Sequence, residues 1–414
     1  MRTEPGLIES EVSANPAPAI SGASQTVISV IVAIAVCHML NDMMQSLLPA
    51  IYPDLKRNLG LSFAQIGIVT LVNQVTASLL QPFVGLYADR RPTPLALPGG
   101  TLFTLAGLLV LSGAHTYAVL LFGAALVGVG SSVFHPESSR VARMAAGRRH
   151  GFAQSMFQVG GNVGQAIGPL AAALIVVRWG QSSIAFFALM SLLCGAILWF
   201  VGVWYKHHGL ERLRGAAAAH AHMVLPSAVV WRGMAILLAL IFSKHVYVAA
   251  ISSYYTFYLI QRFAVSVQSA QIHLFLFLAA AAVGVFLGGP LGDRVGRRAV
   301  IWFSILAPLP LTLLLPHVNL FWTSPVIALI GLIISSAFPA IVVYGQELMP
   351  GKVGMVSGLF FGMAFGFGGL GAAVLGVLAD RHGIVYVYEL CAYLPLIGLL
   401  AWLLPDIRRR SGAT

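Results

Sequence analysis

Apolar runs of membrane-spanning length dominate the chain and constrain its fold more than any other feature. A transmembrane helix needs about 20 predominantly apolar residues. Only 9% of the 414 residues are charged, against about 25% in soluble domains. The sequence therefore predicts an all-α membrane protein with twelve transmembrane helices. The predicted spans are residues 28–50, 63–87, 95–113, 117–139, 151–177, 182–204, 230–258, 270–291, 299–315, 320–344, 354–379 and 385–404.

The predicted spans form two halves that repeat each other. A Gly-to-Asp step at residues 85–89 recurs at 289–293, an offset of 204, and three other matches have an offset of 203. A near-constant offset indicates duplication, and it predicts two pseudo-symmetric six-helix bundles. The predicted parts are a disordered cytoplasmic tail (1–27), a first bundle (28–205), a cytoplasmic linker (206–228), a second bundle (229–405) and a second cytoplasmic tail (406–414).

Lysine and arginine gather on one side of the predicted spans. With both termini in the cytoplasm, 18 of the 24 Lys and Arg lie on the inner side, five lie outside, and Lys244 falls inside a span. This asymmetry fits the positive-inside rule. Topology and contact with the lipid bilayer therefore explain the net charge of +11, and nucleic acid is not an expected partner.

The linker contains His207, His208, His220 and His222, a set large enough to bind a metal. Its Ala-rich, polar composition favours a flexible connection between the bundles instead. We therefore predict neither a metal site nor a cofactor. The three cysteines all lie inside apolar runs, which predicts buried thiols and no disulfide framework.

A motif rich in glycine and charge, Gly289-Pro-Leu-Gly-Asp-Arg-Val-Gly-Arg-Arg298, joins two apolar runs. Charged side chains are excluded from hydrocarbon, so we predict a tight water-side turn here. A weaker copy keeps Gly85, Asp89 and Arg90 but has Pro92 in place of a glycine.

Six plus six spans, with this motif after the second span of each half, resemble the major facilitator superfamily of transporters. Gly164, Gly168 and Pro169 are similar to a fifth-span Gly-x-x-x-Gly-Pro pattern of its drug exporters, whereas Ala124 stands where their fourth-span arginine is expected. Runs at residues 38–47, 134–143 and 251–258 resemble a bacterial branch that exports a small phosphonate antibiotic. The resemblance implies proton-driven efflux of a small anionic drug by a monomer in the bacterial inner membrane.

The motif also predicts a gate. A carboxylate accepts hydrogen bonds well at a helix N-terminus, and neighbouring arginines can pair with acids of the other bundle. Glycines allow close helix contacts. The candidate gate residues are Gly85, Asp89, Arg90, Gly164, Gly168, Pro169, Gly289, Asp293, Arg294, Gly296 and Arg297.

Polar side chains recur on single faces of several spans. The stripes are His38, Asp42 and Gln45 in the first span, Ser131, His135 and Ser138 in the fourth, and the amides Gln154, Gln158, Asn162 and Gln165 in the fifth. Such stripes can simply join helices, but an unpaired charge at mid-bilayer costs at least about 2.5–3.5 kcal/mol, so charged groups there are functional candidates. The candidate substrate and proton cavity comprises His38, Asp42, Gln45, His135, Glu137, Gln158, Asn162, Lys244, His245 and Tyr255.

Asp42 and Lys244 lie at equivalent depths of the two halves, which predicts a pair across a central cavity. We expect Asp42 to carry the proton, with His135 or Glu137 as alternates, and Lys244 to bind the anionic drug. A purely structural ion pair is the alternative for Asp42 and Lys244. His135 and Glu137 can also serve at the cavity mouth or in a gate, and helix-end capping is a further alternative for Glu137.

Export has two alternatives from other functional classes. A proton-coupled importer of a small metabolite has the same fold, because fold does not set direction. An intramembrane enzyme is not predicted, because no spacing places a base on a nucleophile. His135 and Glu137, for example, are two residues apart and point to different sides of a helix.

Overall fold

The structure is a computed structural model that describes residues 25–50, 55, 58–61, 63–209, 226–265 and 267–405. The predicted tails, apart from residues 25–27, and linker residues 210–225 lie outside the described residues. Every regular element among the described residues is a helix. Ten helical stretches are long and apolar enough to cross a membrane. The shorter α5 and the Gln- and Gly-rich α7 bring the crossings in the described part to twelve.

The first half is built from helices that begin with α1 and end with η3. They are α1 (Ile28–Ala50), α3 (Phe63–Leu79), α4 (Gln81–Arg90), α5 (Ala96–Ser112), α6 (Tyr117–Ala145), α7 (His150–Ala171), η1 (Ala172–Val176), α8 (Val177–Trp179), η2 (Gln181–Ile184), α9 (Ala185–Trp204) and η3 (Tyr205–Gly209).

The second half begins with the longest helix of the described chain. Its elements are α11 (Ser227–Phe263), α12 (Val267–Val295), α13 (Arg297–Leu306), α14 (Leu309–Leu314), η4 (Leu315–His317), α15 (Leu320–Ser335), α16 (Ala337–Leu348), α17 (Val353–His382), α18 (Ile384–Cys391) and η5 (Leu394–Leu403).

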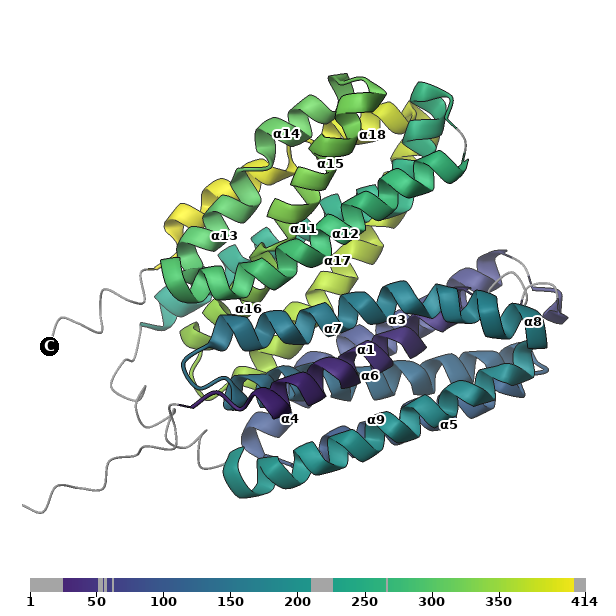
Figure 1. The fold of residues 1–414 in the computed structure, drawn as a ribbon, viewed down its shortest axis with the longest axis vertical. Coiled ribbons are helices and arrows are strands. Elements are labelled where there is room, and N and C mark those ends of the chain that lie inside the picture. The colour runs from purple at the N-terminus through teal and green to yellow at the C-terminus, as the bar shows by residue number, and fades with distance from the viewer. Residues whose placement is uncertain are drawn as a thin grey trace, which may run out of the picture.

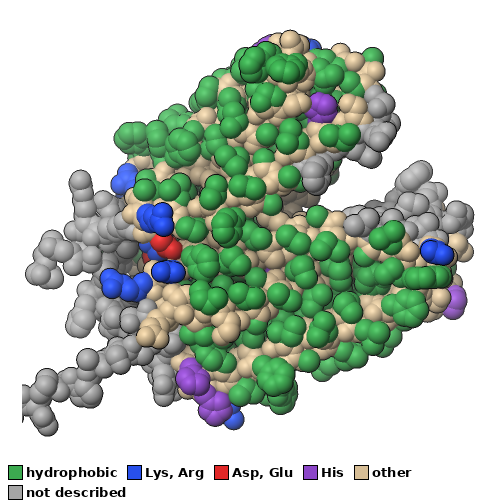
Figure 2. All heavy atoms as spheres, viewed as in Figure 1, with side chains coloured by type: hydrophobic (Ala, Val, Ile, Leu, Met, Phe, Trp, Pro, Cys, Tyr) green, Lys and Arg blue, Asp and Glu red, His purple; other side chains and the backbone are tan. Residues whose placement is uncertain are grey.

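The two halves meet at one end of the molecule and diverge at the other (Figure 1). The main contacts between them join α17 to α3, α4 and α6, and α7 to α12 and α16. Figure 2 shows a wedge-shaped opening between the halves at the far end. Both ends of the described chain lie at the closed end (Figure 1), which we call the inner end.

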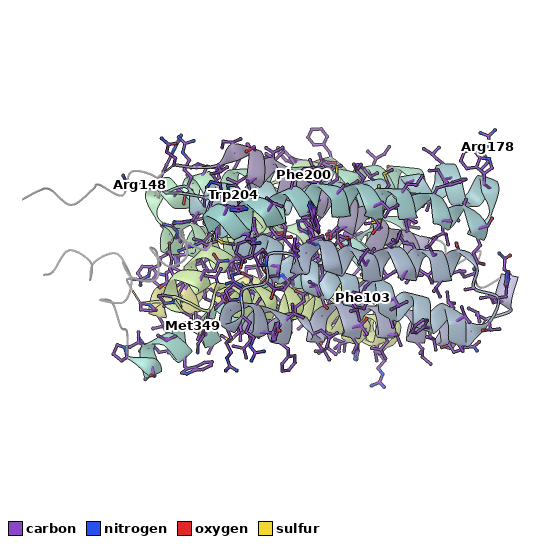
Figure 3. The ribbon with its side chains drawn as sticks, turned by 90° about the horizontal axis from the view of Figure 1, so that it is seen from below. Phe103, Arg148, Arg178, Phe200, Trp204 and Met349 are labelled. Atoms are coloured by element: carbon purple, nitrogen blue, oxygen red, sulfur yellow. The ribbon has the colours of Figure 1, made fainter. Side chains whose placement is uncertain are left out.

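The outer sides of the bundles are apolar, as a lipid-facing surface requires. Phe200 is 74% exposed and Phe103 is 45% exposed, and Figure 3 shows both along the length of the first half. Charged groups gather at the ends instead: Arg148 lies at the inner end and Arg178 at the other (Figure 3). In the view of Figure 2, most Lys and Arg side chains lie at the inner end.

The Gly- and Asp-containing motif is mostly helix, which corrects the predicted ten-residue turn. Helix α12 continues to Val295, and α13 begins at Arg297. Gly296, with φ +103°, is the single turn residue, because a backbone with positive φ favours glycine. The first copy is helical up to Arg90. The aspartates therefore project from the last turns of α4 and α12.

Candidate functional site

A buried acid lies between two histidines in the first half. His38 and Asp42 are one turn apart on α1, and His135 reaches them from α6. The Nε2 atoms of His38 and His135 lie 3.5 and 3.4 Å from the same oxygen, Asp42 Oδ1. All three side chains are at most 4% exposed. We call this set the histidine–aspartate cluster.

Hydrogen bonds to the backbone fix which ring nitrogen of each histidine faces the acid. His38 Nδ1 lies 2.6 Å from the Phe157 carbonyl oxygen, and His135 Nδ1 lies 3.1 Å from the Ser131 carbonyl oxygen. A carbonyl only accepts, so His38 Nδ1 must carry hydrogen. In the neutral His38 ring Nε2 then points a lone pair at the carboxylate. His135 Nδ1 also lies 3.2 Å from Ser131 Oγ, which can donate to it, so both neutral tautomers are open to this ring. A proton added between His38 Nε2 and Asp42 Oδ1 would turn a repulsive contact into a charge-assisted hydrogen bond.

Amide side chains complete the surroundings of the acid. Asn41 donates to Asp42 Oδ1 at 3.0 Å, and Gln165 donates to Oδ2 at 2.9 Å. Gln165 is exposed, whereas Asp42 is 3% exposed. A Cβ added at Gly161 would lie 2.6 Å from His38 Nε2, so only glycine lets α7 approach the cluster this closely.

The same three side chains offer two imidazole nitrogens and a carboxylate oxygen within 4.8 Å of one another, a spacing that could also hold a metal ion. Asp42 Oδ1, however, already faces Asn41 and both histidines, and Oδ2 faces Gln165. A metal would have to displace these contacts, whereas a proton fits among them.

Lys244 is buried in the second half without an acidic partner. It is 6% exposed, and none of the ion pairs among the described residues includes it. Its Nζ lies 4.8 Å from the centre of the Phe338 ring. The predicted pair with Asp42 is therefore wrong for this conformation, because Asp42 has its own histidines and Lys244 lies over an aromatic ring of α16.

One phenyl ring lies between these two groups. The ring centre of Phe361, on α17, lies 5.4 Å from that of His135, 5.8 Å from that of Phe157 and 5.3 Å from that of Phe338. Phe361 thus contacts both the histidine–aspartate cluster and the ring that carries Lys244. His245 also packs edge-on against Phe338 at 5.1 Å, and its Nδ1 donates to the Ile241 carbonyl at 2.9 Å.

The other predicted cavity residues are distributed more widely. Gln45 donates to the Val127 carbonyl at 3.0 Å and joins two helices of the first half. Gln158 is 8% exposed with a buried amide nitrogen that has no hydrogen-bond partner, and Asn162 is half-buried. Tyr255 packs against Tyr258 and Tyr388, which stack on each other in the core of the second half. It therefore does not join the cluster or Lys244.

Two matching carboxylates hold the halves together at the inner end. Asp89 accepts from Gly354 N and Met355 N, both at 2.9 Å. Asp293 accepts from Gly151 N at 2.9 Å and Phe152 N at 3.0 Å. Each acid thus binds the N-terminus of a helix in the other half, where free N–H groups and the helix dipole favour negative charge. We call these the α4–α17 latch and the α12–α7 latch.

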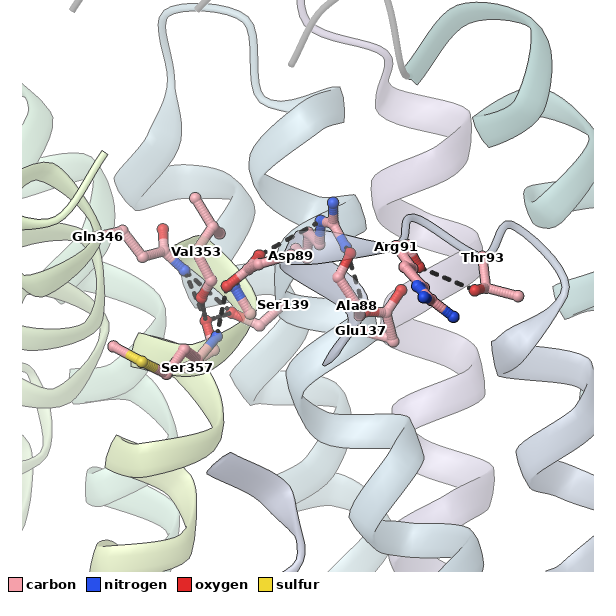
Figure 4. Close-up of polar contacts among 12 residues, drawn as sticks. Ala88, Asp89, Arg91, Thr93, Glu137, Ser139, Gln346, Val353 and Ser357 are labelled. Carbon is pink, nitrogen blue, oxygen red and sulfur yellow. Dashed lines mark hydrogen bonds and ion pairs between the residues drawn. The ribbon is translucent and has the colours of Figure 1, made fainter. Parts of the chain in front are cut away.

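Different charged groups surround the two latches. The Arg140 guanidinium lies 3.8 Å from Asp89 and 3.5 Å from Glu137, all deeply buried (Figure 4). Glu137 therefore belongs to the α4–α17 latch and not to the cavity, which corrects its predicted place. At the other latch Arg297 pairs with Asp293 at 3.1 Å and with Glu347 at 3.3 Å. Across the halves, Arg143 lies 3.8 Å from Glu347.

The remaining predicted gate residues form three groups: glycines between the halves, exposed arginines, and glycines inside the first half. Gly85 and Gly289 lie between the halves, where an added Cβ would lie 2.1 Å and 1.9 Å from a carbonyl oxygen of Gly354 and Gly151, respectively. The side chains of Arg90 and Arg294 are exposed and take part in no ion pair among the described residues.

Gly164 and Gly168 were predicted as gate glycines, but they pack inside the first half. An added Cβ would lie 2.2 Å from the Met39 carbonyl and 1.9 Å from Ser46 Oγ, both on α1. They therefore join two helices of one bundle and do not lie between bundles. The side chain of Pro169 lies outside the described residues.

A buried polar group beside the latches had no counterpart in the predictions. Ser139 Oγ lies 3.0 Å from Gln154 Oε1 and 3.0 Å from Ser357 Oγ, and Gln346 Nε2 donates to both serines. These residues come from both halves, as Figure 4 shows for Ser139, Gln346 and Ser357. Only the amide stripe on α7 hinted at it in the sequence, and that stripe did not reveal its partners.

Comparisons with known proteins agree with this fold. A family model of the Major Facilitator Superfamily matches residues 34–373 and 263–414. The chain is 52% identical to the fosmidomycin resistance protein of Escherichia coli (strain K12), over 97% of this chain and all of that protein. It is 43% identical to the uncharacterized MFS-type transporter YfnC of Bacillus subtilis (strain 168), over 92% of this chain and 94% of that protein.

Among solved structures, the E. coli fucose:proton symporter FucP is similar in fold. One FucP structure, described as the outward conformation, has a TM-score of 0.71 at 14% identity and covers 91% of this chain and 98% of its own. The proton:xylose symporter XylE gives a TM-score of 0.66 at 12% identity, over 91% and 95% of the two chains.

The chain is thus a multi-pass membrane transporter and not an enzyme. It belongs to the Major Facilitator Superfamily.

Proposed function

We propose that this transporter exports a small anionic drug such as fosmidomycin in exchange for protons, by alternating access. The observation that carries the proposal is the pair of separate buried groups: an acid between two imidazoles in one half, and in the other half a lysine that pairs with no acid among the described residues. The 52% identity to the fosmidomycin resistance protein supports the drug class.

Lys244 is the proposed anion site. A buried ammonium without a counterion is costly in a membrane, so a substrate that brings negative charge gains more from it than from an exposed lysine. Fosmidomycin is a phosphonate, and its charged oxygens can accept hydrogen bonds from Lys244 Nζ. Phe338, which lies under the ammonium, and His245, which packs on Phe338, would line the same pocket.

The histidine–aspartate cluster is the proposed proton site. His38 Nε2 and Asp42 Oδ1 are complementary only when an extra proton lies between them, because His38 Nδ1 donates to the Phe157 carbonyl. The proton is assigned to the cluster as a whole, because both histidines face the same oxygen of Asp42.

The two latches support alternating access. In the structure the inner end is shut by Asp89 and Asp293, while a wedge opens at the far end (Figure 2). Rocking of the halves would break both latches and close the wedge. We propose that both termini are cytoplasmic and that a monomer carries out the cycle in the bacterial inner membrane. The structure then represents the outward-open state, which releases drug and receives protons.

Import of a small metabolite together with protons is the alternative, because the similar solved structures FucP and XylE are described as proton symporters. The closer relative is named for drug resistance, which favours export.

Growth of a fosmidomycin-susceptible strain tests the proposal. Expression should raise the inhibitory concentration of fosmidomycin and leave that of uncharged antibiotics unchanged, with Lys244→Ala as the inactive control. Equal susceptibility with and without the protein, at verified membrane expression, would contradict export of this drug.

The orientation has its own test. Single cysteines at Gly60 and Gly215 in a cysteine-free background should react with an impermeant thiol reagent from outside and from inside, respectively. Reaction of both from the same side would contradict the proposed topology.

A further inference from the structure

A serine of the first half enters the hydrogen-bond ladder of a helix in the second half. Ser155, on α7, is 1% exposed. Its Oγ donates to the Val285 carbonyl at 2.7 Å and accepts from Gly289 N at 2.9 Å. Val285 and Gly289 are the carbonyl and N–H that normally bond each other in an α-helix. The hydroxyl therefore competes for both partners of one rung of α12.

The next rung of α12 is weak for a covalent reason. Pro290 lies inside the helix and has no N–H, so it cannot donate to the carbonyl of Phe286. Two successive carbonyls of α12 are thus affected: the Val285 carbonyl accepts from Ser155, and the Phe286 carbonyl lacks its helical donor. Helices bend where a proline or an inserted side chain interrupts this ladder, and here both occur one residue apart.

The packing around Ser155 keeps the hydroxyl in place. A Cβ added at Gly289 would lie 1.9 Å from the Gly151 carbonyl and 2.2 Å from Ser155 Oγ, so the two backbones meet without any side chain between them. One turn later Asp293 binds the N-terminus of α7. The hydroxyl and the latch therefore act on the same short contact between the halves.

The pseudo-symmetric contact lacks this hydroxyl. The residue equivalent to Ser155 at the repeat offset of 203 is Gly358. A Cβ there would lie 2.3 Å from the Gln81 carbonyl, so it approaches the equivalent backbone with no side chain to donate. Gln81 is the residue equivalent to Val285 at the offset of 204. Its carbonyl therefore faces α17 without the hydroxyl that the Val285 carbonyl receives from α7.

We propose that Ser155 is a positioning residue that holds α12 in its inner-closed shape. When the halves separate at the inner end, Ser155 withdraws and the Gly289 N–H is free to bond the Val285 carbonyl. The inner end then closes or opens together with a change in the shape of α12. This role belongs to α12 alone, and it rests on the proposed alternating access but not on the identity of the drug.

The test measures the conformational equilibrium directly. Spin labels at Arg148 and Lys352, exposed residues in opposite halves near the inner end, report the distance between the halves in purified cysteine-free protein without drug or pH gradient. Ser155→Ala removes the hydroxyl but keeps Cβ. It should increase the ratio of inner-open to inner-closed molecules about three- to tenfold, the range that one net hydrogen bond supports.

Two comparison variants separate this role from a general loss of packing. Ser132→Ala removes a hydroxyl that bonds only its own helix, at the Val129 carbonyl, and should leave the distances unchanged. Ser155→Thr keeps a hydroxyl and should keep the inner-closed population. An Ala variant with wild-type distances, or a Ser132→Ala shift of the same size, would overturn the proposal. Because no drug is present, a failed transport assay would contradict the proposed function without affecting this result.

Discussion

The two halves share a helix plan but bury opposite chemistry at the centre. The first half places a carboxylate between two imidazoles, and the second half places an ammonium over a phenyl ring. Neither group has a counterpart of the same kind in the other half: the position equivalent to Asp42 is occupied by His245 at the repeat offset of 203. The two halves thus share one helical frame but bury different ionisable groups in it.

The two latches, in contrast, have nearly the same geometry in both halves. Asp89 and Asp293 bind helix N-termini with nearly identical distances, although only the second motif is complete in sequence. Asp89 is also the more buried of the two, with a side-chain exposure of 5% against 15%. Gate geometry has therefore been preserved in both halves while the central chemistry diverged.

The largest expected effect is that of Asp42→Asn. It removes the acid that holds the histidine–aspartate cluster together, so transport driven by a pH gradient should fall to the level of empty liposomes. Drug binding should persist, because Lys244 lies in the other half. Fosmidomycin uptake and equilibrium binding by the purified variant measure the two effects. If binding is lost together with transport, the division of roles between the halves is wrong.

Lys244→Ala should instead weaken drug binding itself. Loss of a charged hydrogen-bond donor costs about 1.5–3 kcal/mol, which corresponds to drug binding weaker by about tenfold to a hundredfold. Calorimetric titration measures the dissociation constant. Lys206→Ala, a change at an exposed lysine of the inner end, is the matched control. Unchanged affinity would assign the anion to another group.

The latch variants should have a smaller effect on rate. Asp89→Asn and Asp293→Asn keep the side-chain size but lose the charge that binds a helix N-terminus, worth about 0.3–1 kcal/mol and up to about 2 kcal/mol when partly buried. Each should slow transport by severalfold at normal expression. Because Asp89 is more deeply buried, its variant should be at least as slow. A harmless Asp89→Asn would restore the expectation, drawn from Pro92, that the first motif is degraded.

The single histidine variants should differ least from each other. His38→Gln and His135→Gln each remove one of two Nε2 atoms that face the same oxygen at 3.5 and 3.4 Å. Both should shift the pH dependence of transport in the same direction and leave drug affinity near that of the wild type. A pH profile of uptake for each variant is the measurement. Opposite shifts would show that the two rings have distinct roles.

The sequence predicted the parts that depend on composition and on spacing along one helix. The twelve spans, the two halves and the stripe of His38 and Asp42 on α1 all follow from apolar run length, a fixed offset and helical periodicity. The contacts between distant segments did not follow. His135 was placed on a separate stripe, and nothing in the spacing shows that it shares an oxygen with His38.

Equal depth also proved a poor guide to pairing. Asp42 and Lys244 lie within one residue of the repeat offset of 203, but side-chain direction and the intervening Phe361 decide which groups meet. Glycines were equally ambiguous: Gly164 and Gly289 have the same residue type, yet one packs inside a bundle and the other lies between bundles. Such choices depend on how helices pack in three dimensions, which a single sequence does not encode locally.

The most direct test of the proposed division of roles is proton movement caused by the drug. In weakly buffered proteoliposomes, an inward fosmidomycin gradient should drive protons out and make the lumen alkaline in the wild type. Asp42→Asn should show no proton movement although it still binds the drug. Acidification of the lumen on drug entry, or proton movement that persists in Asp42→Asn, would contradict proton exchange at the histidine–aspartate cluster.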